Sequence, residues 1–210
     1  MKLVYTHPDA AGEELWFESV AELARSRGVP VKLVESLDAP SEEAVVRAVQ
    51  PEFLLSFYFR RMIPARVLTI PSKGALNMHG SLLPAFRGRS PVNWAILKGA
   101  AFTGASLHYM TEKPDAGDLV DQERVSIGPD DDALTVSRAV SEAAVVVLAR
   151  SWPKLKAGTA PRVPLDLKKG SYFGGRKPAD GLVNWLLPAQ EVHDLVRAVA
   201  RPWPGAFTDA

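Results

Sequence analysis

Cysteine is absent from the 210 residues, which excludes disulfide bonds, thiolate-bound zinc and a cysteine nucleophile. An excess of one charge is also lacking, because 25 lysines and arginines accompany 24 acidic residues, so no nucleic-acid surface is indicated. No run approaches the roughly 18 apolar residues of a membrane span, and the N-terminus lacks a signal-peptide core. The remainder, 47% hydrophobic and 23% charged, is typical of one soluble globular domain. We therefore expect a cytoplasmic protein that does not contact a membrane.

Short apolar runs predict six strands, at Lys2–Tyr5, Val31–Val34, Phe53–Phe57, Gly74–His79, Gly104–Met110 and Leu119–Ile127. Helical spacing predicts helices at Glu13–Arg27, Ser41–Val49, Pro91–Leu97, from about Ala133, and at Ala189–Val199. Gly28 should stop the first helix, Ser41 should cap the second, and Pro153 should kink or end the fourth. Alternating strands and helices predict an α/β fold with a mostly parallel central sheet and catalytic groups at carboxyl ends of strands.

The most informative stretch is NMHGSLLPAFRGRSP, which runs from Asn77 to Pro91 and is followed by the acidic turn Lys113–Gly117. Asn77 and His79 leave the same face of a predicted strand, because side chains alternate along a strand. Asp115 in the turn can return to meet the histidine. An amide, an imidazole and a carboxylate are suited to moving an acyl group onto a nucleophile.

For an amine attacking a formyl carbon, Asn77 would donate a hydrogen bond to the developing oxyanion, an effect worth roughly 2.7–4 kcal/mol. His79 would carry the proton from the attacking amine to the leaving nitrogen, and Asp115 would orient His79 and raise its pKa. No step needs a metal. Each residue also has a structural interpretation, because histidines at strand ends are commonly hydrogen-bonded and Asn and Asp are common in turns.

The stretch NMHGSLLPAFRGRSP, with the later KPDAGDLV, resembles the core motif of enzymes that use 10-formyltetrahydrofolate as formyl donor. The likeness extends from about Phe53 to Gly205. It implies a Rossmann-like formyltransferase domain, a one-carbon group transferase, with catalytic roles for Asn77, His79 and Asp115. It also implies 10-formyltetrahydrofolate as co-substrate, held without a metal by these residues: Arg61, Met62, Ile63, Arg89, Thr111, Glu112, Lys113, Pro114 and Asp115. The side chains of Met62 and Ile63 can equally be core, and Arg89 a surface ion pair.

Several segments are similar to the sugar branch of this family, the UDP-4-amino-4-deoxy-L-arabinose formyltransferases and related sugar N-formyltransferases. These segments are Ser56–Arg60, Gly88–Trp94, Leu107–Met110 and Val199–Gly205. The resemblance implies a nucleotide-linked amino sugar as acceptor and a part in lipid A modification. Trp94 and Trp185 are expected to pack, and His7 borders the sugar side. His108 and His193 are assigned no chemistry.

Two alternatives stay open. One is methionyl-tRNA formylation, which the near-neutral charge disfavours and which would give strongly salt-dependent binding. The other is a truncated remnant that binds folate without turnover. A dehydrogenase or decarboxylase partner, fused or separate, is compatible with the family.

The resemblance also predicts that parts of the family's scaffold are missing. Residues 1–160 correspond to the catalytic domain, apparently without the family's first strand–helix unit, whose strand lies inside the sheet. Residues 161–210 form an irregular extension and a helix leading to a C-terminal subdomain that is expected to be absent. Losing a central strand leaves backbone groups unpaired, so we expect low stability. Thermal melts of this chain and of an N-terminally extended form would test this, and equal melting temperatures would contradict it.

Overall fold

The structure is a computed structural model that describes residues 1–8 and 16–209. Its N-terminal part contains the strands β1 (Val4–Thr6) and β2 (Val31–Leu33) and the helices α1 (Val20–Ser26) and α2 (Pro40–Val49). The middle contains β3 (Leu54–Phe57), α3 (Ala65–Leu68), β4 (Ala75–His79), β5 (Arg87–Gly88), α4 (Pro91–Leu97), β6 (Phe102–Tyr109), β7 (Leu119–Ser126) and α5 (Ala133–Ala157). The C-terminal part contains β8 (Tyr172–Phe173), two short 3₁₀ turns (Leu167–Lys169 and Pro178–Gly181) and α6 (Ala189–Ala198).

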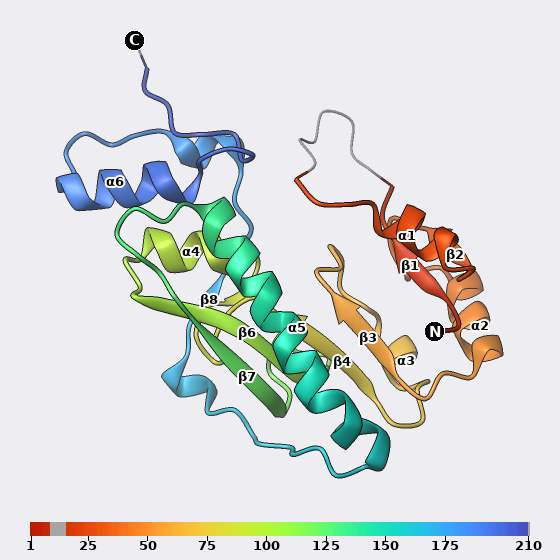
Figure 1. Ribbon diagram of the computed structural model, residues 1–210. Helices are drawn as coiled ribbons and strands as arrows, with labels where there is room; N and C mark the ends of the chain where they lie inside the picture. Colours follow the sequence, from red (N-terminus) through yellow and green to blue (C-terminus); the bar gives the residue numbers. More distant parts are fainter. Residues whose placement is uncertain (9–15, 210) are drawn as a thin grey trace.

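The central sheet has the strand order β3-β4-β6-β7, and α5 lies across one of its faces (Figure 1). Strand pairs β1–β2, β3–β4 and β5–β8 are parallel, whereas β4–β6 and β6–β7 are antiparallel. The α/β class is thus confirmed, and three of these five strand pairs are parallel, one of them in the central sheet. The antiparallel hairpin is a feature that the sequence did not predict. The short connection at residues 110–118 requires it, because parallel neighbours need a long crossover.

Strand β4 supplies both the core and the site. Leu76 and Met78 are fully buried in the main hydrophobic cluster, which also contains Val140 and Val147 of α5. Asn77 and His79 alternate with them and therefore leave the opposite face of the strand. The apolar face thus anchors the strand against the helix while the polar face is left for chemistry.

The N-terminal strands form a sheet of their own. Within residues 1–8 and 16–209, β1 pairs only with β2, and no strand joins β1 to β3. Tyr5 of β1 and Leu54 of β3 instead pack against one shared hydrophobic cluster that contains Val46 and Val67. Side-chain packing, rather than strand pairing, therefore connects this part of the described chain to the central sheet.

Three predicted helix features are wrong. In the described part of the predicted helix Glu13–Arg27, α1 begins only at Val20, because Ser19 caps it by accepting from Glu22 N (3.3 Å); residues 13–15 lie outside the described residues. Ser41 is not the cap of α2, which starts with Pro40 after Ala39.

The third is the end of the helix at Pro153, one of the two predicted effects of this proline, since α5 runs on to Ala157. The carbonyl that loses its partner to a proline belongs to the residue four positions earlier, here Ala149. Ala149 is exposed, so water can take the missing place, while Leu155 is buried and holds the last turn in the core.

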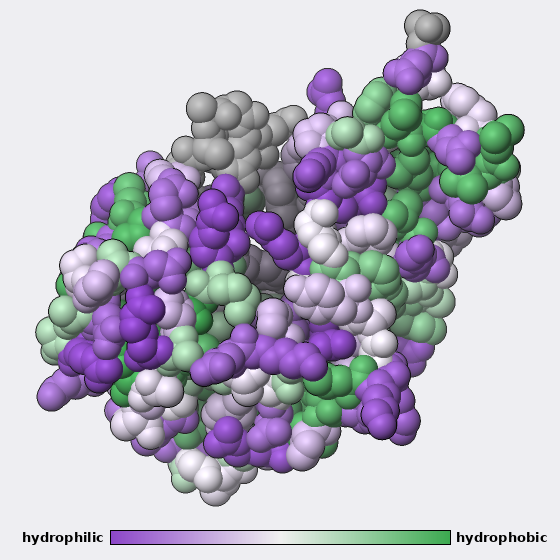
Figure 2. Space-filling view, turned by 180° about the vertical axis from the view of Figure 1, so that it is seen from behind, coloured by the Kyte–Doolittle hydropathy of each residue, from purple (hydrophilic) through white to green (hydrophobic). Residues whose placement is uncertain are grey.

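Apolar side chains gather on the surface near the C-terminal end (Figure 2). Leu186 is 94% exposed there, and Leu182, Trp185 and Phe207 are also exposed. None of the described helices is both long and apolar enough to cross a membrane.

Candidate active site

Asn77, His79 and Asp115 come together as the sequence predicts. Asn77 and His79 lie on β4, and Asp115 lies in the loop between β6 and β7. The Asp115 Oδ1 atom is 3.6 Å from His79 Nδ1. His79 is buried, and only 13% of the Asp115 side chain is exposed, so both groups interact with little screening by water.

His108 also belongs to this cluster of side chains, although the sequence assigns it no chemistry. It is 2% exposed on β6, directly across from Asn77 in the strand register. Its Nε2 atom lies 3.3 Å from Asn77 Nδ2 and 3.5 Å from Asp115 Oδ1. A histidine in the strand-like run Thr103–His108, all of which is buried, could have indicated a role for His108. Placing it beside Asn77 also requires the register between β4 and β6, which the sequence does not give.

Two backbone carbonyls fix one protonated ring nitrogen on each of the two histidines. His108 Nδ1 lies 2.8 Å from the carbonyl of Tyr109, and His79 Nε2 lies 2.9 Å from the carbonyl of Phe86. A carbonyl only accepts, so each of these nitrogens carries the proton. His108 Nε2 lies between the amide of Asn77 and Asp115 Oδ1, and His79 Nδ1 is left as the unprotonated nitrogen beside Asp115.

Burial lowers the pKa of His79, and the charge of Asp115 and the Phe86 carbonyl only partly oppose this, so the pKa lies below its usual value. The upward effect of Asp115 on the pKa of His79 agrees with the sequence prediction, and burial of the ring, which the sequence does not show, outweighs it. Burial alone would raise the pKa of Asp115, yet bonding by His108, the attraction of His79 and the Gly88 N–H together lower it. At neutral pH the site therefore holds a neutral imidazole beside a carboxylate.

Strained backbone surrounds these side chains. Among the described residues, the non-glycine residues with positive φ are Gln50, Tyr58, Phe86, Ser90 and Asp115. Apart from Gln50, which ends α2, they all lie close to the site in sequence or by contact. Such conformations each cost about 1–3 kcal/mol and persist only where neighbouring contacts enforce them. The Gly88 N–H is one such contact, because it donates to Asp115 Oδ2 at 2.8 Å.

The residues predicted to hold folate divide into three groups. Ile63 is 5% exposed inside the second hydrophobic cluster, so its side chain belongs to the core and only its backbone is left for a ligand. Arg61, Met62 and Arg89 are exposed. The loop residues Thr111, Glu112 and Lys113 are exposed, and Pro114 and Asp115 are partly buried. That loop is held by a hydrogen bond from Thr111 Oγ1 to the carbonyl of Lys113 (2.9 Å).

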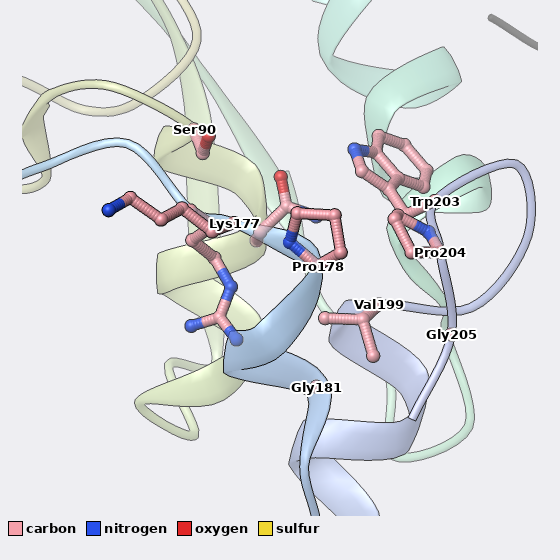
Figure 3. Close-up of a pocket in the computed structure, with 10 residues that line it drawn as sticks. Ser90, Lys177, Pro178, Gly181, Val199, Trp203, Pro204 and Gly205 are labelled. Atoms are coloured by element: carbon pink, nitrogen blue, oxygen red, sulfur yellow. The ribbon is translucent and has the colours of Figure 1, made fainter. Parts of the chain in front are cut away.

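A cavity of about 100 Å³ is lined by residues at the start of α4 and in the C-terminal part of the chain (Figure 3). Ser90 and Lys177 lie on one side of it, and Val199 and Trp203 on the other. No catalytic side chain lines it. Ser90 nevertheless follows Gly88 closely in the chain, and Arg176 and Lys177 bring two positive charges to this wall.

Comparison with known proteins agrees with this geometry. Residues 13–151 match the model of the formyl transferase family, and residues 176–210 match the model of the formyl transferase C-terminal domain. The chain therefore belongs to the formyl transferase family and is a formyl-transferring enzyme. The second match falls within residues 161–210, which the sequence predicts as an extension leading to that subdomain.

Solved structures share the fold at low sequence identity. A sugar N-formyltransferase from Shewanella is 22% identical, with a TM-score of 0.75, covering 90% of this chain and 74% of its own. A formyltransferase from Anoxybacillus kamchatkensis, in complex with UDP-4,6-dideoxy-4-formamido-L-AltNAc and tetrahydrofolate, is 22% identical, with a TM-score of 0.61 and coverages of 83% and 86%. An N-formyltransferase from Helicobacter canadensis, in complex with folinic acid and dTDP-3-aminofucose, is 19% identical, with a TM-score of 0.69 and coverages of 91% and 68%.

Proposed function

We propose that this protein transfers the formyl group of 10-formyltetrahydrofolate to the amine of a nucleotide-linked amino sugar, such as UDP-4-amino-4-deoxy-L-arabinose. The observation that carries the proposal is the cluster of Asn77, the buried His79 and the partly buried Asp115 in a chain of the formyl transferase family. Similar folds bind both kinds of molecule, since the Helicobacter protein holds folinic acid with dTDP-3-aminofucose.

The proposed chemistry follows from the tautomers. The neutral amine attacks the formyl carbon, a carbon–nitrogen bond forms, and the carbonyl oxygen becomes negative. The amide of Asn77 has a second N–H besides the one directed at His108, and this donates to the oxyanion. His79 Nδ1 takes the proton of the amine and passes it to N10 of the folate as the bond to that nitrogen breaks. The resulting imidazolium faces Asp115, whose charge stabilises it.

The charges near the cavity favour an acceptor that carries a diphosphate. Arg176 and Lys177 line the cavity, and the exposed Arg89 lies against Gly175. Arg176 is held in place because its guanidinium lies over the ring of Trp94 and donates to the carbonyl of Asp180 (2.9 Å). Fixed guanidinium groups are well suited to phosphate oxygens. The amine of a sugar bound through its diphosphate can then point toward His79.

The proposal is tested by mixing the protein with 10-formyltetrahydrofolate and a panel of amines: UDP- and dTDP-amino sugars, the same sugars without nucleotide, and methionyl-tRNA. Tetrahydrofolate release would be followed spectroscopically and the formamide identified by mass spectrometry. Turnover should require both the nucleotide and the amino group. Turnover only with methionyl-tRNA, or tight folate binding with no product from any amine, would overturn the proposal.

Substitution of Lys177 tests recognition of the acceptor separately from the chemical step. Because it lines the cavity but does not contact the catalytic side chains, Lys177→Ala should raise KM for the nucleotide sugar about tenfold, as expected for loss of one charged hydrogen bond. KM for 10-formyltetrahydrofolate and kcat should stay nearly unchanged. Lys169→Ala, which removes an exposed lysine of the same segment, is the matched control. Equal effects of the two variants would refute a role for the cavity.

A further inference from the structure

The loop Phe86–Ser90 makes two of the contacts that define the catalytic set. The Phe86 carbonyl accepts from His79 Nε2, and the Gly88 N–H donates to Asp115. The same loop has positive φ at Phe86 (54°), Gly88 (97°) and Ser90 (53°). A backbone with this much left-handed conformation does not hold its shape by itself, so other contacts must enforce it.

Those contacts come from a distant segment, Gly170–Gly174, here called the strap. Of the four backbone N–H groups of Phe86–Arg89, that of Gly88 donates to Asp115 and the other three donate to the strap. Phe86 N donates to Ser171 Oγ (2.9 Å), Arg87 N to the Ser171 carbonyl (3.0 Å) and Arg89 N to the Phe173 carbonyl (3.0 Å). The loop therefore bonds to the strap through Phe86, Arg87 and Arg89, and to the carboxylate of Asp115 through Gly88.

Aromatic stacking also connects the strap to the loop and to α4. The ring of Phe173 lies between Phe86 (centroids 5.7 Å apart) and Trp94 (4.7 Å), nearly parallel to both. Trp94 Nε1 donates to the carbonyl of Gly174 (2.9 Å). The loop and the strap are closely packed, since a Cβ on Gly88 would lie 2.1 Å from the Phe173 carbonyl oxygen.

We propose that the strap is a positioning element of the catalytic site: it holds the Phe86 carbonyl against His79 Nε2 and so keeps Nδ1 as the proton-accepting nitrogen. The strap lies between the two stretches that match family models, residues 13–151 and 176–210, and belongs to neither match. A segment that sequence comparison treats as a connection thus takes part in setting the geometry of the site. The consequence for catalysis rests on the role of His79 in the proposed function.

The test measures the tautomer of His79 directly, without substrate, by long-range ¹H–¹⁵N NMR of protein labelled at its four histidines. The His79 signal is assigned from its loss in His79→Gln. In the unaltered protein, Nε2 should carry the proton. In Ser171→Ala and Phe173→Ala, the Nδ1-protonated form should appear and the pKa of His79 should fall further, because the carbonyl that favours its protonation is no longer held.

Phe102→Ala, which removes an exposed phenylalanine at the far end of β6, is the control and should change neither property. Phe173→Leu, which keeps most of the side-chain volume, should recover part of the effect. Should Phe173→Ala fail to fold, Ser171→Ala and Phe173→Leu carry the test, since both are small changes. An unchanged tautomer and pKa in Ser171→Ala and in whichever Phe173 variants fold would overturn the proposal.

Kinetics supply the second readout. With an accepted amine, Ser171→Ala and Phe173→Ala should lower kcat about tenfold or more, as expected when a catalytic group is displaced from a distance, with little change in KM for either substrate. If no amine is formylated by the unaltered protein, the proposed function fails while the NMR result still decides the role of the strap. Normal kcat in both variants, in a protein that does turn over, would also overturn it.

Discussion

Replacing His79 by alanine should abolish formyl transfer while leaving the protein folded. The imidazole is the only group at the site, among the described residues, that combines a free nitrogen lone pair with a neighbouring carboxylate and a backbone-fixed tautomer. General acid–base catalysis contributes about 10²–10⁴-fold, so kcat should fall by at least that much. Steady-state release of tetrahydrofolate measures the loss, and circular dichroism establishes that the variant is folded.

Two further variants separate chemistry from structure. His79→Gln can still donate a hydrogen bond toward the Phe86 carbonyl but cannot accept a proton, and it should be as inactive as His79→Ala. His193→Ala removes an exposed histidine from α6 and should leave the rate unchanged. Appreciable turnover in His79→Gln would falsify the assignment of proton transfer to this residue.

How much of this site the sequence contains differs from one residue to the next. Asn77, His79 and Asp115 are predictable because β4 places two of them on one face and the turn chemistry of Lys113–Gly117 marks the third. His108 is not, because its role depends on antiparallel pairing with β4, which hydrophobic periodicity does not specify. The strap is harder still, since Ser171 lies 85 residues after Phe86 in the chain, and two-residue strands leave no periodic pattern.

The fold shows the same division. From β3 to α5, the positions of β3, β4, α4, β6, β7 and the start of α5 were predictable, because each has an apolar run and a capping or turn residue at its end. The elements α3 and β5 were not predicted, because four and two residues are too short to show a period. The split of the strands into separate sheets was not, because it depends on which strand edges find partners in space. Side-chain packing through Tyr5 and Leu54 connects the N-terminal part, and such tertiary contacts cannot be derived from one sequence.

Asp115→Asn should lower kcat about a hundredfold, the lower end of the range for acid–base catalysis. Asparagine can still accept from the Gly88 N–H, so the loop should keep its shape. The negative charge that stabilises the protonated form of His79 is lost, however. That charge raises the pKa of His79, so its removal should lower the pKa further and move the acidic limb of the kcat/KM profile to lower pH. A profile that does not move, or moves to higher pH, would show that Asp115 does not act on His79 through its charge.

The same substitution should also change the dependence of stability on pH. The pKa of Asp115 is lower in the folded protein than its usual value of 3.8, so the ionised carboxylate stabilises the fold at neutral pH. This contribution is present above about pH 3.8 and is lost as the pH falls through the folded-state pKa. Asp115→Asn should therefore be slightly less stable than the unaltered protein at pH 7, and the difference should shrink on acidification below that value. Denaturant unfolding at several pH values measures both. A variant more stable at pH 7 would mean that desolvation of the carboxylate outweighs its contacts with His108, His79 and Gly88.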